Sequence, residues 1–160
     1  MPLSIPVWDF LDRDFLTISP DANLGEAMES MNEAAKKGKT SRSLVVIGKD
    51  RQPLGVISMR NVLDAFKSEF SIFSGLLGQE SLHDALENGL RKCSERQVKD
   101  YMVKVPTLKM SDDIITAYKM LTEKRLDVRA LPVVEAGKVE GVVRIPELFD
   151  ALCDAYRKIA

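Results

Sequence analysis

Ser58, Arg60 and Asn61 are the residues whose types and spacing could hold a phosphorylated ligand. They follow an apolar run at residues 54–57 and lie within a residue or two of a predicted helix start. The first turn of a helix leaves backbone N–H groups without helical partners, and its partial positive charge favours anions. Ser58 adds a hydroxyl, Arg60 a forked cation and Asn61 groups that can bond to ribose hydroxyls. The alternative is an ordinary cap, in which Ser58 satisfies the backbone and Arg60 lies in solvent.

An internal repeat places this motif in a larger unit. Residues 55–66 align without a gap with residues 141–152, and residues 44–47 align with residues 131–134. Further upstream, Thr17 aligns with Thr107 and Leu24 with Ile114. Because all three blocks occur in the same order, we interpret the chain as a duplicated unit.

Each repeat is predicted to fold as strand, helix, strand, strand, helix. Short extended stretches at 16–19 and 105–109 lead to polar helix-start signals, Ser19–Asp21 and Ser111–Asp113. Apolar residues at helical spacing follow, then two β-branched runs around a turn and a closing helix. The predicted fold class is α/β (α+β). The expected organisation is an N-terminal segment with the first repeat (1–70), a helical insert (71–97) and the second repeat (98–160).

The repeated unit resembles the cystathionine-β-synthase (CBS) domain, and the tandem resembles a CBS pair, or Bateman module. The resemblance is carried by LVVIGKDRQPLGVISMRNVLDAF in the first repeat, and by VKDYM and LPVVEAGKVEGVVRIPELFDAL in the second. It implies two repeats packed through their sheets with pseudo-twofold symmetry, and two clefts for adenosine ligands. The ligands implied are AMP, ADP or ATP, ahead of S-adenosylmethionine. It also implies a homodimer.

In the first cleft, the resemblance places Ser58 toward phosphate and Asn61 toward ribose, with Asn61 standing where Asp is commoner. Backbone groups at the start of the second strand would meet the adenine edge, and the opening strand would line the cleft. The residues expected to bind ligand here are Thr17, Ile18, Ser43, Leu44, Val45, Ser58, Arg60 and Asn61. For the apolar members, core packing is the alternative.

The second repeat departs from this motif, because Arg144 and Glu147 align with Ser58 and Asn61. Arg144 cannot cap a helix as serine does, and Glu147 would repel a nearby phosphate. Either this cleft is degenerate and empty, or Arg144 contacts phosphate and Glu147 contacts ribose. We therefore expect unequal clefts and one ligand per chain. The residues assigned to the second cleft are Thr107, Arg129, Ala130, Leu131, Pro132, Arg144 and Glu147.

Two other segments have competing interpretations. Residues 38–40 end like a phosphate-binding P-loop, but Glu33 stands where its first glycine belongs, and the strand and helix come in the wrong order. This lysine-rich segment is interpreted as a solvated helix end, and the alternative is that it reaches the outer phosphates of a nucleotide in the neighbouring cleft. Between the repeats, an apolar patch and an amphipathic helix at 81–93 either cover the chain's own core or form a docking or dimer surface. The patch consists of Phe70, Ile72, Phe73, Leu76 and Leu77.

Composition narrows the remaining classes of protein. The 160 residues are 45% apolar and 29% charged, which are globular values. The chain has 23 basic and 24 acidic residues, and it therefore lacks the basic excess that is typical of proteins dedicated to nucleic-acid binding. No apolar run is long enough to span a membrane and the N-terminus does not resemble a signal peptide, so a cytoplasmic protein is expected. Two cysteines and one histidine cannot supply a disulfide framework or a zinc site, and no cofactor is expected to be required.

The function predicted from these features is non-covalent sensing of an adenine nucleotide. Nothing in the sequence resembles a nucleophile paired with a base, so catalysis is not expected. The output would then pass to an effector protein in trans or through a dimer interface. Two alternatives remain: an interaction or dimerisation scaffold that binds no small molecule, and an enzyme whose active site forms between subunits.

Overall fold

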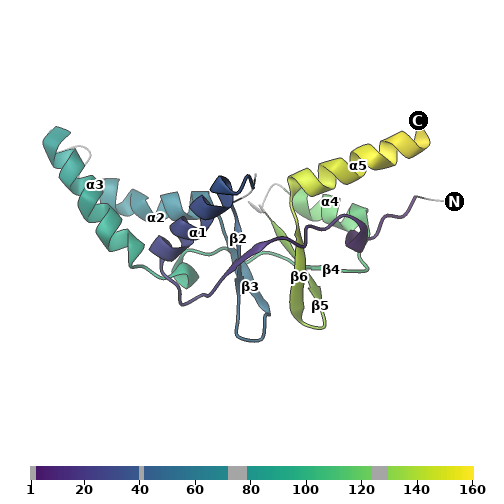
Figure 1. The fold of residues 1–160 in the computed structure, drawn as a ribbon, viewed down its shortest axis with the longest axis horizontal. Coiled ribbons are helices and arrows are strands. Elements are labelled where there is room, and N and C mark those ends of the chain that lie inside the picture. Colours follow the sequence, from purple (N-terminus) through teal and green to yellow (C-terminus); the bar gives the residue numbers. More distant parts are fainter. Residues whose placement is uncertain (1–2, 40–41, 72–78, 124–129) are drawn as a thin grey trace.

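The structure is a computed structural model that describes residues 3–39, 42–71, 79–123 and 130–160. It contains two repeats side by side (Figure 1). The first repeat comprises β1 (Leu16–Ile18), α1 (Leu24–Lys36), β2 (Leu44–Ile47), β3 (Pro53–Ile57) and α2 (Met59–Ser71). The second comprises β4 (Leu108–Lys109), α4 (Ile114–Thr122), β5 (Leu131–Glu135), β6 (Lys138–Val143) and α5 (Ile145–Ile159). Helix α3 (Gln79–Ser94) lies between them in the chain, and a short 3-10 helix precedes each repeat, at Val7–Asp9 and Val98–Asp100.

Each repeat builds one three-stranded sheet, in the orders β1-β2-β3 and β4-β5-β6. The first two strands of each sheet are parallel and the last two antiparallel. This confirms the predicted α/β class and the order strand, helix, strand, strand, helix. Strand β4 is shorter than the predicted stretch, since only Leu108 and Lys109 pair with β5.

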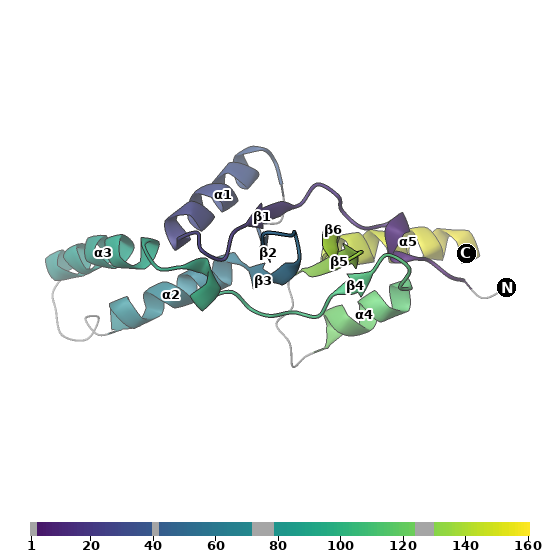
Figure 2. The same cartoon turned by 90° about the horizontal axis from the view of Figure 1, so that it is seen from below.

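The sheets face each other at the centre, and the helices cover their outer faces (Figures 1 and 2). Alternation along β2 produces this arrangement. Leu44 and Val46 are buried among residues of α1 and α2, whereas Val45 packs with Val139 and Val142 of β6. The same strand therefore contributes to two cores, which explains its continuous apolar run.

The segments that precede the repeats cross over, so that each lies on the other repeat. The N–H of Val7 donates to the carbonyl of Asp112 (2.8 Å), just before α4. In the other half, the N–H of Val98 donates to the carbonyl of Ala22 (2.8 Å), just before α1. We call residues 5–14 the first arm and residues 96–103 the second arm. Their equivalent contacts confirm a pseudo-twofold relation between the repeats (Figure 2).

Each arm also pairs with the last strand of the opposite sheet, at Val142 for Asp12 and at Val56 for Val103. Glycines allow this close approach. A Cβ on Gly55 would lie 2.8 Å from the carbonyl oxygen of Val103, and a Cβ on Gly141 would lie 2.9 Å from that of Asp12. These contacts explain why both aligned repeats have a glycine at this position.

The first helix of each repeat begins at an Asx cap. Asn23 Oδ1 accepts from the N–H of Glu26 (2.8 Å), so Asn23 is the N-cap of α1. The predicted helix start at Ser19–Asp21 was wrong, because these residues lie in the turn before the cap. Asp113 Oδ1 accepts from the N–H of Ile115 (3.1 Å), within the predicted signal. Asp113 Oδ2 also anchors the first arm, accepting from the N–H of Ile5 (3.0 Å). The hydrogen bond from Ile115, with smaller contributions from the arm, lowers the pKa of Asp113.

Helix α3 packs on the first repeat through its C-terminal end. Cys93 is fully buried, and its Sγ donates to the carbonyl of Ala65 in α2 (3.4 Å). Leu86 and Leu90 are exposed, so this helix buries only part of its predicted apolar face. Of the predicted patch between the repeats, the Phe70 side chain and the other four residues lie outside what the structure describes. None of the helices in the described ranges is sufficiently long and apolar to span a membrane.

Candidate functional site

Ser58 and Asn61 are joined in a reciprocal cap at the start of α2. Asn61 Oδ1 accepts from the backbone N–H of Ser58 (2.8 Å) and from its hydroxyl (3.0 Å). Ser58 Oγ in turn accepts from the N–H of Asn61 (3.3 Å). Ser58 is only 8% exposed, the one buried polar residue among those described. The cap fixes the hydroxyl and the amide side by side at the positive end of the helix.

The sheet register places the other residues assigned to the first cleft near this cap. Leu44 pairs with Ile57, so Ser43 and Ser58 lie just beyond the same end of the β2–β3 ladder. Thr17 pairs with Val45 one strand further away. The structure thus brings Thr17, Ile18, Leu44 and Val45 onto neighbouring strands of a single sheet, and Ser43 and the Ser58–Asn61 cap lie at one end of that sheet.

Three of the side chains assigned to the first cleft have orientations that the sequence left open. The Leu44 side chain packs among the helices and that of Val45 faces the opposite sheet, so core packing accounts for both side chains. Arg60 is 69% exposed and pairs with Asp64 one turn along α2 (3.5 Å). The structure therefore does not bring the Arg60 guanidinium to the Ser58–Asn61 cap, and the solvated alternative describes this side chain better.

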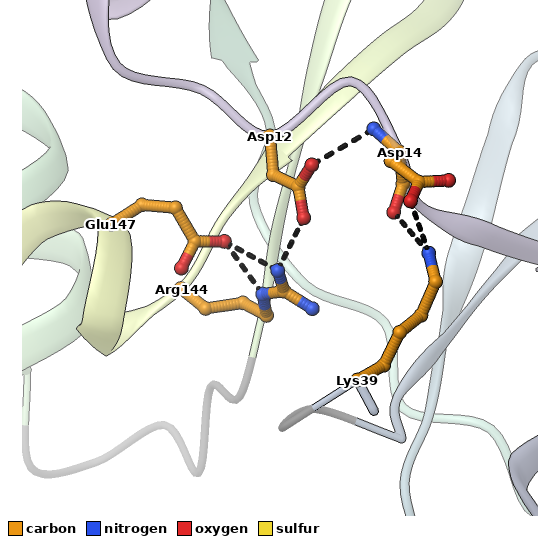
Figure 3. A network of polar contacts seen from close by, with 5 residues as sticks. All are labelled: Asp12, Asp14, Lys39, Arg144 and Glu147. Carbon is orange, nitrogen blue, oxygen red and sulfur yellow. Dashed lines mark hydrogen bonds and ion pairs between the residues drawn. The ribbon is translucent and has the colours of Figure 1, made fainter. Parts of the chain in front are cut away.

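Arg144 occupies the N-cap position of α5 but makes no side-chain cap bond. Its guanidinium lies between two carboxylates instead (Figure 3). Nε donates to Glu147 Oε1 (2.7 Å), and Nη2 donates to Asp12 Oδ2 of the first arm (2.5 Å). The side chains of Arg144 and Glu147 are only 15% and 14% exposed. One cation thus faces two anions, and the local charge is negative rather than suited to phosphate.

The other residues assigned to the second cleft are divided between two places. Ala130, Leu131 and Pro132 are buried where β5 begins, and Leu131 pairs with Val143, next to Arg144. Thr107 is exposed and lines a hollow of about 510 Å³ with Trp8 and residues 134–137, beyond the other end of β5. Arg129 lies outside the described residues.

Lys39, from the segment that resembles the end of a P-loop, is bound to the first arm (Figure 3). Its Nζ donates to the backbone carbonyl of Asp14 (2.7 Å) and pairs with the carboxylate of the same residue (2.9 Å). The hydrogen bond and the charge of Lys39 lower the pKa of Asp14. The N–H of Asp14 donates to Asp12 Oδ1 (2.8 Å), so a continuous polar network runs from Lys39 in the first repeat to Arg144 in the second.

Sequence reasoning missed Asp12, the partner of Arg144, and Asp14, which joins Asp12 to Lys39. They lie in an extended arm without periodicity, and Asp12 is separated from Arg144 by 132 positions. The only sequence signal for them would have been similarity between the two arms. That signal fails at Asp12, because the equivalent residue of the second arm is Val103. Within the described ranges, no group of three or more His, Cys, Asp or Glu side chains could hold a metal ion.

A family model, that of the CBS domain, matches the chain twice, over residues 7–68 and 98–154. No curated protein sequence matches the chain.

Several solved structures have the same fold along nearly the whole chain. The CBS-pair protein CBSX2 from Arabidopsis thaliana is 21% identical, with a TM-score of 0.68, over 97% of this chain and 99% of its own. A structure of CBSX2 in complex with AMP is 22% identical, with a TM-score of 0.65, over 94% of this chain and 98% of its own. A CBS-domain-containing protein from Agrobacterium tumefaciens is 24% identical, with a TM-score of 0.64, over 92% of each chain.

Proposed function

The chain belongs to the CBS-domain family as a tandem pair of repeats, and on this premise we propose that it is a regulatory module that binds an adenine nucleotide in its first cleft. The observation that carries this proposal is the Ser58–Asn61 cap, a buried hydroxyl and an amide held together at the start of α2. The AMP complex of CBSX2 supports the ligand class.

The chemistry of the cap fits a nucleotide with few phosphates. The N-terminus of α2 offers backbone N–H groups to a phosphate, and Ser58 holds its hydroxyl beside them. Asn61 uses Oδ1 within the cap, which leaves its Nδ2 group as a donor for a ribose hydroxyl. Since Arg60 pairs with Asp64, the described residues of this cap add no cation for further phosphates. We therefore expect AMP to bind at least as tightly as ATP.

Calorimetric titration of the purified protein with AMP, ADP, ATP and S-adenosylmethionine tests the proposal. We expect one AMP per chain and a rise in the thermal midpoint when ligand is in excess. Asn61→Ala should weaken AMP binding by about tenfold, the effect of losing one or two hydrogen bonds. Asn88→Ala, on the exposed face of α3, is the matched control and should bind like the wild type. No heat and no thermal shift with any of these ligands would contradict the proposal.

The same incubations address catalysis. A sensing module returns its nucleotide unchanged, because binding acts only through different affinities for two conformations. Chromatography of AMP and ATP after prolonged incubation should recover both intact. Conversion that purified protein accelerates in proportion to its concentration would favour an enzyme instead.

We also propose that the chain forms a homodimer through α5, because this helix carries a second apolar stripe. Leu148, Ala151 and Ala155 are buried against the core, but Phe149 and Tyr156 are 62% and 67% exposed. The exposed stripe follows the alternating spacing of four and three residues that is typical of helix–helix seams. Its members are Ile145, Phe149, Leu152, Tyr156 and Ile159.

Charge favours a second copy of the same helix as the occupant of this stripe. The N-terminal half of α5 carries Asp150, and its last turn carries Lys158 and Arg157, of which Arg157 pairs with Asp154 of the same helix (2.7 Å). Two antiparallel copies would place the acidic half of each helix opposite the basic end of the other. Light scattering should therefore report a dimer, and Phe149→Glu should shift it to monomer, whereas Leu86→Glu on α3 should not. A wild-type monomer at all concentrations would contradict this arrangement and leave the stripe to an effector protein.

A further inference from the structure

Asp12 is paired with Arg144, the cation that the family resemblance offers to a phosphate in the second cleft. In the first repeat, the position equivalent to Arg144 is Ser58, whose hydroxyl is engaged in its own cap. In the second repeat, the Arg144 guanidinium bonds both to Glu147 in the first turn of α5 and to Asp12, an arm residue that comes from the other end of the chain (Figure 3). A carboxylate and a phosphate use the same forked donors of arginine. Asp12 therefore occupies the guanidinium donor of Arg144 that a phosphate would need.

The backbone holds Asp12 in this position. Its N–H donates to the carbonyl of Val142 (2.8 Å), and its carbonyl accepts from the N–H of Val142 (2.9 Å). The close contact with Gly141 keeps the arm against β6. The N–H of Asp14 binds Oδ1 (2.8 Å), which leaves Oδ2 directed at Arg144. The carboxylate is thus already oriented toward Arg144 before any ligand binds. A ligand must displace a fixed side chain, which makes the competition stronger.

The local charge also opposes an anion. Arg144 faces both Asp12 and Glu147, and all three side chains are at most 29% exposed. The sum of these three charges is one negative charge in a place where solvent screens weakly. The equivalent contact of the second arm is made by Val103, which carries no charge. The difference between the two clefts therefore arises in the arm as well as in the helix start.

We propose that Asp12 is an intramolecular competitor for Arg144, which sets the anion affinity of the second cleft and keeps this cleft closed to phosphorylated ligands. The proposal rests on the proposed function for the ligand class, but the competition itself concerns any phosphate. Removal of the Asp12 charge frees one side of the Arg144 fork and removes the excess negative charge. The second cleft then accepts a phosphorylated ligand, and the chain binds two where it bound one.

The test compares Asp12→Asn with Asp14→Asn, a matched change of the same charge in the same arm. Asp14 is 87% exposed and faces Lys39, so its loss leaves Arg144 paired. Calorimetry with pyrophosphate measures anion binding, and calorimetry with AMP measures stoichiometry. We expect Asp12→Asn to bind pyrophosphate at least about tenfold more tightly than the wild type, the gain from one charge-assisted hydrogen bond. Asp14→Asn should match the wild type.

Further variants keep the result interpretable. Asp12→Ser retains a short acceptor for the N–H of Asp14 and serves if Asp12→Asn unfolds, as judged by its thermal midpoint. The double variant Asp12→Asn with Arg144→Gln should lose the added affinity. Unchanged pyrophosphate affinity in folded Asp12→Asn and Asp12→Ser would overturn the proposal, and so would an equal gain in Asp14→Asn or a gain that survives Arg144→Gln. If the wild type binds no AMP, the proposed function fails, while the pyrophosphate comparison still decides the competition.

Discussion

Substitution of Gly55 by alanine tests the crossing of the second arm directly. The added Cβ would lie 2.8 Å from the carbonyl oxygen of Val103, a backbone atom that no side-chain rotation can move. Carbon and oxygen normally approach to about 3.3 Å, so the arm must retreat by about 0.5 Å. Two hydrogen bonds of 2.9 Å join Val56 to Val103 at this point, and both would lengthen.

The magnitude follows from these two bonds. Each contributes about 1 kcal/mol net, so the loss of both in Gly55→Ala would cost about 2 kcal/mol of unfolding free energy. The smaller entropy of the unfolded alanine chain offsets about 0.4–1 kcal/mol of this, which leaves a net loss of about 1–1.6 kcal/mol. For a chain of this size, the thermal midpoint should fall by roughly 2–6 °C.

Urea unfolding and amide hydrogen exchange together measure the effect. Faster exchange at Val56 and Val103 should accompany the loss of stability, because the arm opens locally. Gly25→Ala is the control: its Cβ would meet Asn23 Oδ1 at 3.2 Å and Ser94 Cβ at 3.4 Å, in a helix that favours alanine. If Gly55→Ala were as stable as the control and the amide hydrogen of Val103 exchanged at the wild-type rate, the inferred clash between residue 55 and the Val103 carbonyl would be refuted.

Three further results are expected from single substitutions. Asp113→Ala should cost about 1–2 kcal/mol in urea unfolding, because the residue both caps α4 and anchors the first arm at Ile5; a loss below about 0.3 kcal/mol would contradict this. Because the pKa of Asp113 is lowered, its contribution is complete above about pH 4 and is lost as the pH falls through the lowered value. The deficit of Asp113→Asn relative to wild type should therefore shrink as the pH falls below about 4, and a constant deficit would speak against it. Arg144→Met should lose about 1–3 kcal/mol, because it leaves the Asp12 and Glu147 carboxylates together without their cation; unchanged stability at low salt would show that the network contributes nothing.

The repeats and their elements were predictable because their signals are local. Leu24, Ala27 and Met31 recur at helical spacing, and all three are buried in one core. The helix start at Ser58 and the proximity of Asn61 also follow from residues that are neighbours in the chain. Helical spacing alone could not assign Phe149 to solvent, because α5 carries two apolar stripes and only one contacts the core.

The crossing of the arms could not be predicted from the sequence. Its contacts are mainly backbone hydrogen bonds, such as that from Val98 to Ala22, and these leave no preference for residue type. The partner of Arg144 was missed for a related reason, since an aspartate in an extended segment has many possible cations. The boundaries at 70 and 97 and the assignment of residues to ligand stay predictions, and the experiments proposed above test the ligand contacts.

The crossed arms have a consequence for how the chain is made. A ribosome releases the first repeat before the second exists, so residues 5–14 emerge about a hundred residues ahead of the strand and helix start that hold them, Ile5 being 108 positions from Asp113. Until then β3 also lacks the segment around Val103 that pairs with it. Closure of such long loops is slow compared with the formation of helices and hairpins. We expect the edge of β3 in the nascent first repeat to stay unpaired until the second repeat has been synthesised. In pulse-labelling hydrogen exchange during refolding, the amides of Val7 and Asp12 should be protected last.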